Sequence, residues 1–235
     1  MKAVIKDKKE IARGTLWVRF EFSERISFKP GQIFFITLPL LLFEDLRGAT
    51  RHFSIVSSPT DRKAIEMTTR LRGSGFKETL SKLDLWTEVE INDIEGNFVL
   101  PENPDKPLVF IAGGIGITPF VSMLRFIKDK KLFDYQTNLI YSNREREVAP
   151  FLDELQTMSN ENLNFKLILT MTKDSKWNGE KRRINEKFLK DYLNDFNKYL
   201  YMIAGPPGFV SGMINVLREA GVDKENVKAE RFSGY

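Results

Sequence analysis

The amino-acid sequence predicts two domains: an antiparallel all-β domain, followed by an α/β domain with a doubly wound parallel sheet. Two observations lead to this prediction. The hydrophobic pattern changes character near residue 100, and a proline-rich stretch, "LPENPDKP" at residues 100–107, separates the two patterns. We place the boundary so that the domains are residues 1–103 and 104–235. With 42% hydrophobic residues in 235, each half can build a core.

Six short segments before residue 100 are rich in β-branched or aromatic residues and partly alternate, which is typical of strands. The expected strands are residues 3–6, 15–22, 32–38, 53–56, 65–71 and 88–93. Strands at this spacing favour an antiparallel barrel or sandwich. The stretch 75–83 instead predicts a short helix, because Phe76, Leu80 and Leu83 fall on one helical face.

Near-continuous apolar runs alternate with helical patterns in the second half of the chain. The runs are residues 108–112, 137–141, 165–170 and 198–204. Strands that are buried on both faces are hydrophobic throughout, as these are. The alternation of strand and helix therefore predicts a parallel sheet with right-handed crossovers.

Three glycines, Gly113, Gly114 and Gly116, lie in the turn between the first of these strands and a helical pattern. Thr118 suits the N-cap of that helix, and Pro119 its first position. A bare backbone lets a ligand approach, and a helix N-terminus attracts phosphate. The turn matches neither the G-x-G-x-x-G motif nor a P-loop, so a tight turn without a ligand is the alternative.

A second glycine-bearing turn, Gly205-Pro206-Pro207-Gly208, follows the strand predicted at residues 198–204 and leads into another helical pattern. Ligands of open α/β sheets bind at the carboxyl ends of the strands. Two such turns at one sheet edge indicate an extended ligand. A rigid Pro-Pro connection is the alternative for this turn taken alone.

Composition excludes several classes of site. The chain has no cysteine, which rules out thiolate zinc sites, cysteine nucleophiles and cysteine-ligated iron–sulfur clusters within it, and the single histidine, His52, rules out a multi-histidine metal centre. We therefore expect no metal site. The net charge of +4 is spread over both halves, which argues against nucleic acid. No apolar run is long enough to span a bilayer, so we expect no membrane insertion and a cytoplasmic protein.

Six short motifs occur in order along the chain. They are Arg51-His52-Phe53-Ser54, Ser57-Ser58-Pro59, Gly73-Ser74-Gly75-Phe76-Lys77, "GGIGITP" at residues 113–119, Gly205-Pro206-Pro207 and Glu230-Arg231-Phe232. In order and spacing they resemble the ferredoxin–NADP reductase superfamily, over nearly the whole chain. The resemblance implies a six-stranded antiparallel β-barrel that binds FAD, followed by a domain that binds NADPH or NADH. It also implies hydride transfer from nicotinamide C4 to flavin N5, and then single electrons to a separate carrier such as ferredoxin or flavodoxin.

The resemblance implies roles for residues of the first domain. Arg51 would pair with the flavin pyrophosphate, Phe53 would stack on the isoalloxazine where the family usually has tyrosine, and Ser54 would contact N5 as a catalytic group. The further implied cofactor contacts are His52, Ser57, Gly75, Phe76 and Lys77. Main-chain groups of the last three would hold the pyrophosphate, which favours FAD over FMN. A solvated arginine, a core phenylalanine and a surface lysine are the alternatives for Arg51, Phe76 and Lys77.

In the second domain the resemblance implies a nicotinamide dinucleotide site. Its expected contacts are Gly113, Gly114, Gly116, Thr118, Gly205 and Pro206. Ser142 and Arg144 would surround a 2′-phosphate, Arg146 adds charge, and no acidic residue stands at that strand end to hold a free 2′-hydroxyl. NADPH is therefore slightly favoured over NADH. A solvated surface patch explains the same residues.

The C-terminal residues complete the implied site, with one departure. Ala204 stands where the family has a cysteine that contacts nicotinamide, which leaves nicotinamide placement open. Glu230 matches a family acid near the flavin edge and is the second catalytic candidate. Either Phe232 or Tyr235 would cover the isoalloxazine face.

Two alternatives to a reductase with bound FAD stay open: an NAD(P)H:flavin reductase that uses flavin as a substrate, and an electron-transfer or regulatory subunit of a larger complex. A small acidic electron carrier is a plausible partner of the first. Its docking face would consist of the basic residues Arg62, Lys63, Arg70, Arg72 and Lys77, although scattered basic residues are often only solvated.

Overall fold

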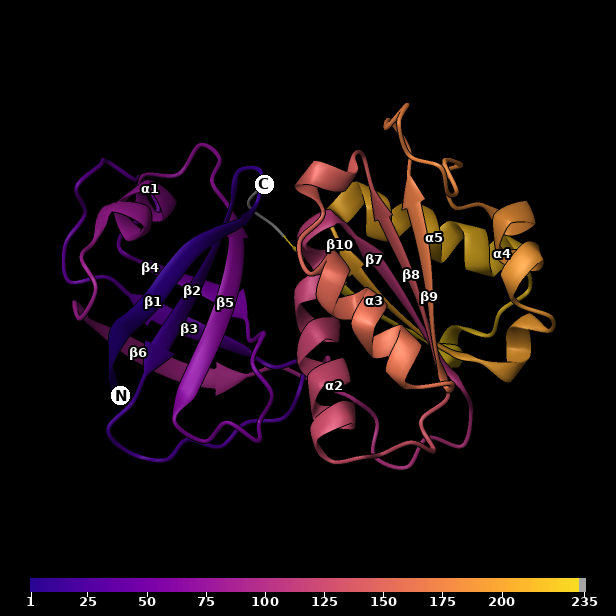
Figure 1. Cartoon of the computed structure of the whole chain (residues 1–235), viewed down its shortest axis with the longest axis horizontal. Helices are drawn as coiled ribbons and strands as arrows, with labels where there is room; N and C mark the ends of the chain where they lie inside the picture. The colour runs from indigo at the N-terminus through magenta and orange to yellow at the C-terminus, as the bar shows by residue number, and fades with distance from the viewer. Residues whose placement is uncertain (233–235) are drawn as a thin grey trace. The chain divides into compact units, whose positions relative to one another are not determined.

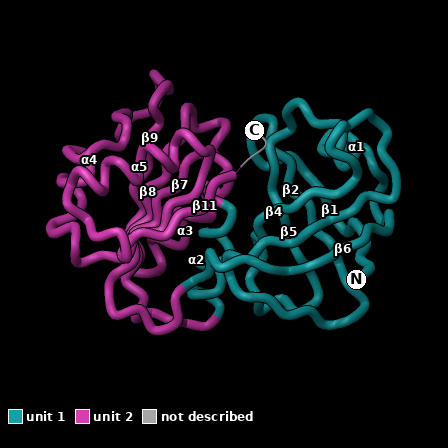
Figure 2. The backbone as a smooth tube through the Cα atoms, turned by 180° about the vertical axis from the view of Figure 1, so that it is seen from behind, with its two compact units in different colours: residues 1–100, 118–129 teal, residues 101–117, 130–235 magenta. Residues whose placement is uncertain are grey.

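The computed structural model describes residues 1–232 and divides into two compact units. Unit 1 consists of residues 1–100 together with 118–129, and unit 2 consists of residues 101–117 together with the chain from residue 130 onward (Figure 2). The segment 118–129 therefore groups with the first unit, although it follows the first glycine-rich turn.

Unit 1 is built on a six-stranded antiparallel sheet with the order β4-β3-β6-β1-β2-β5 (Figure 1), as predicted. The strands are β1 (Lys2–Ala12), β2 (Thr15–Glu21), β3 (Ile33–Thr37), β4 (Thr50–Ser54), β5 (Ala64–Arg70) and β6 (Glu88–Glu95). The end strands β4 and β5 also approach each other. Phe20, Phe34 and Ile36 are fully buried in the core of this sheet.

Two strands differ most from their predicted bounds, because pairing, not local sequence, sets their ends. β1 continues to Ala12 because its charged second half pairs with β2. β4 covers Thr50–Ser54, whose residues pair with β3, and not residues 53–56. The chain then leaves β3, since the Val56 N–H donates to the Glu66 carbonyl oxygen at 2.8 Å, across to β5.

The short helix α1 (Gly75–Lys82) lies where residues 75–83 predicted one. Ser74 caps it, since its side chain accepts a hydrogen bond from the Lys77 N–H. Phe76 and Leu80 are fully buried, and they anchor the helix to the core of the barrel.

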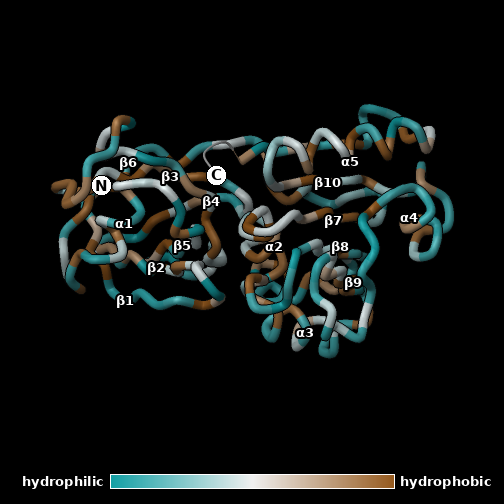
Figure 3. Tube along the Cα trace, turned by 90° about the horizontal axis from the view of Figure 1, so that it is seen from above, coloured by the Kyte–Doolittle hydropathy of each residue, from teal (hydrophilic) through white to brown (hydrophobic). Residues whose placement is uncertain are grey.

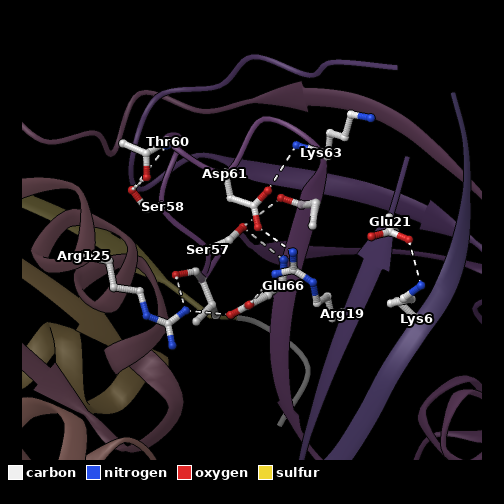
Figure 4. Close-up of polar contacts among 12 residues, drawn as sticks. Lys6, Arg19, Glu21, Ser57, Ser58, Thr60, Asp61, Lys63, Glu66 and Arg125 are labelled. Carbon is white, nitrogen blue, oxygen red and sulfur yellow. Dashed lines mark hydrogen bonds and ion pairs between the residues drawn. The ribbon is translucent and has the colours of Figure 1, made fainter. Parts of the chain in front are cut away.

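The second helix of unit 1, α2 (Thr118–Asp129), is attached to the barrel by polar contacts (Figure 4). The Ser122 hydroxyl donates to the Ser57 carbonyl at 2.7 Å. Arg125 donates to Glu66 at 2.6 Å, and Glu66 also accepts from Arg19 at 3.0 Å. A single carboxylate on β5 therefore links α2 to β2.

Unit 2 contains a five-stranded parallel sheet with the order β11-β10-β7-β8-β9. The strands are β7 (Leu108–Gly113), β8 (Thr137–Asn143), β9 (Phe165–Met171), β10 (Leu200–Gly205) and β11 (Val227–Arg231). The predicted doubly wound α/β class is confirmed, and four of the strands lie at the predicted apolar runs. β11 was not predicted, because it is a partly exposed edge strand without an apolar run.

Helices cover both faces of this sheet. α3 (Leu152–Glu161) lies on one face, and α5 (Pro207–Glu219) lies on the other (Figures 1 and 3). α4 (Glu186–Tyr192) shares a core cluster with α5 and with residues of β7 and β10. Figure 3 shows hydrophobic residues concentrated along β7 and β10, between the helical layers.

The first glycine-rich turn joins a strand to a helix, as predicted, but with a different boundary. A 3₁₀ turn, η1 (Gly114–Ile117), runs directly into α2, so Thr118 is the first residue of the helix and not its N-cap. A 3₁₀ turn already engages the backbone groups that a capping side chain would otherwise satisfy.

Candidate functional site

The two glycine-bearing turns of unit 2 lie side by side at the carboxyl edge of the parallel sheet. They follow the neighbouring strands β7 and β10, in which Ala112 pairs with Ala204. Within the sheet, β8 is the neighbour of β7 on one side, and β10 is its neighbour on the other side. This is the topological switch point, where open α/β sheets bind their ligands.

Packing explains two of the three glycines in the first turn. A Cβ atom on Gly116 would lie 2.2 Å from the Ala204 carbonyl oxygen, and one on Gly113 would lie 2.6 Å from the Phe209 ring. Gly114 differs, because its φ is +55° and nothing lies within 4 Å of its Cβ position. The close approach of the two turns therefore requires Gly116, while the backbone at Gly114 is open.

We expect Gly116→Ala to destabilise unit 2 by about 2 kcal/mol, because the new methyl group meets backbone atoms that cannot move independently. Thermal unfolding measures this change. Gly208→Ala is the matched control: its Cβ position on α5 is free of contacts, so we expect a gain of roughly 0.5–1 kcal/mol there. Equal melting temperatures for the two variants would contradict the packing argument.

The end of β8 holds the residues that were predicted to meet a 2′-phosphate. Ser142 is half-buried and Arg144 is exposed. One expectation was wrong, because an acid does reach this strand end. The Asp174 carboxylate, from the loop after β9, accepts a hydrogen bond from the Arg146 N–H at 3.2 Å, and this bond lowers the pKa of Asp174.

Sequence reasoning missed two polar side chains near this edge. Asn143, the last residue of β8, is 6% exposed, and both polar atoms of its amide are buried. The indole Nε1 of Trp177, in the loop after β9, is also buried. Within residues 1–232 none of these atoms has a hydrogen-bond partner. A buried polar atom without a hydrogen-bond partner costs free energy of folding. A polar ligand or a water molecule that bonds to these atoms would recover that free energy.

Glu230 and Phe232 lie beside the second turn. Glu230 is on β11 in register with Ala204, and the Phe232 N–H donates to the Gly205 carbonyl at 2.9 Å. Among the described residues the buried Oε2 of Glu230 has no hydrogen-bond partner, and burial raises the pKa of this carboxyl to about 7. Tyr235 lies outside the described residues.

In unit 1 the structure brings together three of the predicted cofactor residues. The Arg51 guanidinium carbon lies 5.4 Å from the centre of the Phe76 ring, and the Phe53 ring lies 6.0 Å from it. His52 projects to the other face of β4 and packs against Phe35. Ser54 is 7% exposed at the end of the strand.

Arg51 is nearly buried and does not stand free as a strand-end charge. It donates to the carbonyl oxygens of Arg47 at 2.7 Å, Gly48 at 3.0 Å and Thr50 at 2.6 Å. It also forms an ion pair with the carboxylate of Asp45, whose side chain is 8% exposed. Sequence reasoning missed Asp45, although an acid six residues before an arginine in a short loop was a possible signal.

Asp45 occupies the N-terminus of α1, where the resemblance implied a pyrophosphate. Its Oδ2 accepts hydrogen bonds from the Ser74 hydroxyl and the Phe76 N–H, both at 2.9 Å. These bonds, led by that of Phe76, hold the pKa of Asp45 well below its usual value. A Cβ on Gly75 would lie only 2.2 Å from the Glu44 carbonyl oxygen. The chain itself therefore covers this turn.

The other two predicted residues of unit 1 also have local partners. Ser57 is buried, and its hydroxyl donates to the Ala64 carbonyl at 3.3 Å and accepts from the Glu66 N–H at 3.1 Å. Lys77 is 7% exposed, and burial lowers its pKa. Arg70 is buried as well and donates to the Thr15 hydroxyl. The expected basic docking face therefore loses Arg70 and Lys77.

Two whole-chain features bear on the class of site. Among residues 1–232, no group of three or more histidine, aspartate or glutamate side chains could hold a metal ion. In the same range no helix has the length and hydrophobicity needed to cross a membrane.

The fold and the switch-point turns define a class: a β-barrel unit joined to a dinucleotide-binding type of α/β unit. Residues 110–214 match the family of oxidoreductase NAD-binding domains. This match covers part of unit 2, and the two-domain fold is shared with solved reductases; both support the resemblance to FAD- and NAD-binding, ferredoxin reductase-like oxidoreductases that the six motifs carried.

Curated relatives are longer than this chain. Flavohemoprotein A of Dictyostelium discoideum is 26% identical over 88% of the chain and 53% of the relative. The glycine betaine monooxygenase reductase subunit of Pseudomonas aeruginosa is 28% identical over 87% of the chain and 56% of the relative. The chain therefore spans about half the length of the curated relatives it matches.

Solved structures share the fold at low identity. The FAD/NAD-binding domain of a nitric oxide dioxygenase from Vibrio cholerae superposes with a TM-score of 0.84 at 16% identity, over 98% of both chains. A ferredoxin NADP⁺ reductase from Neisseria gonorrhoeae, with bound FAD and NADP, gives a TM-score of 0.80 at 22% identity, again over 98% of both chains.

Proposed function

We propose that the protein is a flavin-dependent NAD(P)H oxidoreductase that passes electrons to a separate carrier protein. The observation that carries this proposal is the pair of glycine-bearing turns at the switch point of unit 2, with Gly116 against the Ala204 carbonyl. They lie within the match to oxidoreductase NAD-binding domains. The paired turns favour an extended ligand, as a nicotinamide dinucleotide is.

The residues of unit 1 fit a phosphate-bearing flavin in their chemistry. Arg51, the Ser74 hydroxyl and the Phe76 N–H form a donor set that already holds one oxyanion, the carboxylate of Asp45. We assign the flavin phosphate to this donor set and the isoalloxazine to the side of Phe53 and Ser54. A bound flavin would supply the redox chemistry, accepting a hydride from reduced nicotinamide and releasing electrons singly.

The chain's own residues would bind and orient the nicotinamide dinucleotide, and one of them would hold a proton. The glycine turns would let a nicotinamide dinucleotide approach the backbone, with Gly114 as the open position. We propose that Glu230, with a pKa of about 7, holds a proton at its carboxyl near neutral pH and can release it. Ala204 offers no thiol contact to the nicotinamide.

Two groups near the end of β8 favour different nucleotides. Arg144 is exposed and favours a 2′-phosphate. Asp174, beside the Arg146 N–H, is an acceptor that suits a free 2′-hydroxyl. We keep NADPH as the proposed donor because Ser142, Arg144 and Arg146 together offer hydrogen-bond donors and positive charge to a 2′-phosphate.

The carrier is proposed to be a small acidic protein such as ferredoxin or flavodoxin. The reductase subunit of glycine betaine monooxygenase, a relative, is by its name a component of a larger enzyme. These 235 residues include no cysteine to bind an iron–sulfur cluster, so the proposed carrier lies outside them.

A second candidate is an NAD(P)H:flavin reductase, in which flavin is an exchanging substrate. The specific observation that favours it is the Asp45 carboxylate in the phosphate donor set, because an internal competitor weakens flavin binding.

One experiment separates these functions. The protein is incubated with FAD and desalted, and its absorbance spectrum is recorded under anaerobic conditions before and after addition of NADPH, and separately of NADH. We expect a visible flavin band that survives desalting and is bleached faster by NADPH. Flavin that is lost on desalting but reduced in free solution would favour the second candidate. Bound flavin that neither nucleotide bleaches, or no flavin binding at all, would contradict both.

A further inference from the structure

The Asp45 carboxylate fills a binding site that is suited to a phosphate. Its Oδ2 accepts from the Ser74 hydroxyl and from the Phe76 N–H. Its Oδ1 accepts from the Arg47 N–H at 3.0 Å and pairs with Arg51. A main-chain N–H at a helix start, a hydroxyl and a guanidinium are the donors that proteins use for phosphate groups.

Positive charge around this carboxylate exceeds what one aspartate neutralises. Arg51 and Lys77 are both nearly buried, and Arg47 adds a third cation. The charges of Arg47 and Arg51 act with burial to lower the pKa of Lys77, and Asp45 opposes them. A ligand with two negative charges would match the cluster better than the carboxylate does.

The segment that carries Asp45 is built as a separate loop. We call residues 42–48 the strap. Its neck is closed by the Leu38 N–H bond to the Ala49 carbonyl at 3.0 Å and by the Thr37 and Thr50 hydroxyls at 2.8 Å. Leu41, just before the strap, packs against the barrel core. The strap can therefore move without loss of the β3–β4 pairing.

The strap itself buries little. Leu42 is 53% exposed, Phe43 37% and Leu46 97%. It is held to α1 mainly by polar contacts: those of Asp45, and the Leu42 and Phe43 N–H groups, which donate to the Thr79 hydroxyl at 3.0 and 3.3 Å. The Asp45–Arg51 pair is itself buried, with both side chains 8% exposed, so the carboxylate can leave only if a ligand takes over its hydrogen bonds.

We propose that Asp45 is an internal stand-in for the flavin phosphate, and that FAD binds by exchange, displacing the carboxylate and lifting the strap from Gly75. The proposal rests on the proposed function, because it takes the ligand to be a flavin dinucleotide. Exchange is required because the Glu44 carbonyl covers Gly75, and the Phe76 N–H is already bonded. Flavin affinity is then reduced by the fraction of molecules in which the strap is closed.

The test measures flavin affinity in Asp45→Asn by quenching of flavin fluorescence. With the charge removed, we expect the Kd for FAD to fall roughly tenfold and the association rate to rise. Riboflavin, which has no phosphate, is expected to bind both proteins equally. Glu44→Gln is the matched control, because it removes one exposed charge from the same strap, and we expect its FAD affinity to stay within about twofold of the original.

Hydrogen exchange in the unsubstituted protein keeps the test independent of how well Asp45→Asn folds. We expect FAD to speed exchange in residues 42–48 and to slow it at Phe76. Stronger protection of the strap by FAD would overturn the proposal, as would weaker FAD binding by a folded Asp45→Asn. If neither protein binds FAD, the proposed function itself fails. If both bind it equally and nicotinamide reduces it, the function stands and only the exchange is overturned.

Discussion

Replacing Glu230 with glutamine is expected to stabilise unit 2 by about 3 kcal/mol at mildly alkaline pH, and to change its stability little below about pH 5. The cause is the burial of a carboxyl whose Oε2 has no hydrogen-bond partner among residues 1–232. Burial raises its pKa from the ordinary value of 4.5 to about 7. The native state then binds a proton that the unfolded chain releases, which costs stability when the carboxyl must ionise.

The sign of the pH dependence follows from this order of pKa values. Between pH 4.5 and about 7 the native state holds more protons at Glu230 than the unfolded state, so stability falls as the pH rises through this window. Above the window the full cost remains. Glutamine has no charge to bury, so the variant loses none of this stability.

Hydrogen exchange of β10 and β11 at several pH values measures the effect within unit 2. The matched control is Glu225→Gln, in the short turn just before β11, because Glu225 is exposed. We expect it to leave the pH dependence unchanged. A carboxyl ¹³C titration that places Glu230 near its ordinary pKa, or equal pH profiles for the protein and Glu230→Gln, would refute the prediction.

The fold could be predicted because its signals are local. The buried runs of β7 and β10 are hydrophobic at nearly every position, and such runs need no partner to be recognised. The second half of β1 and the whole of β11 lacked that signal. Each becomes a strand by pairing with a neighbour, β2 or β10, which only the three-dimensional structure supplies.

The site could be predicted only in part, for the same physical reason. Arg51, Phe53 and Phe76 were predicted to act together, and the structure brings their side chains together. Asp45 was missed because its bond to the Phe76 N–H joins residues 31 positions apart, in a loop with no periodic pattern. Asn143 was missed because an amide at the end of a strand differs from an exposed one only in being buried, and the sequence does not show burial.

The carboxylate of Glu66 offers the second large effect, in unit 1. Glu66→Gln is expected to lower the free energy of unfolding by about 2–3 kcal/mol, because one group satisfies three partners. It accepts from Arg125 at 2.6 Å, from Arg19 at 3.0 Å and from the Trp17 indole N–H at 3.2 Å (Figure 4 shows the two arginines). The Glu66 side chain is 12% exposed, so water replaces the lost contacts poorly.

The loss should concentrate on α2. Arg125 would keep its bond to the Val56 carbonyl at 3.3 Å, but it would lose its ion pair with Glu66 in a half-buried position. We therefore expect faster hydrogen exchange in residues 118–129 of the variant, with β1 and β6 little changed. A double-mutant cycle with Arg125→Met isolates the pair, and we expect a coupling energy of about 1–2 kcal/mol.

Glu88→Gln is the control, because the Lys2–Glu88 ion pair has a similar N–O distance of 2.7 Å, but its side chains are 77% and 58% exposed. Exposed pairs contribute little, so we expect no measurable change in the free energy of unfolding. The contrast between the two variants tests whether burial decides the strength of these ion pairs. Equal losses of stability, or a coupling energy near zero for Glu66 and Arg125, would show that the attachment of α2 rests on its apolar contacts and on the Ser122 bond to the Ser57 carbonyl.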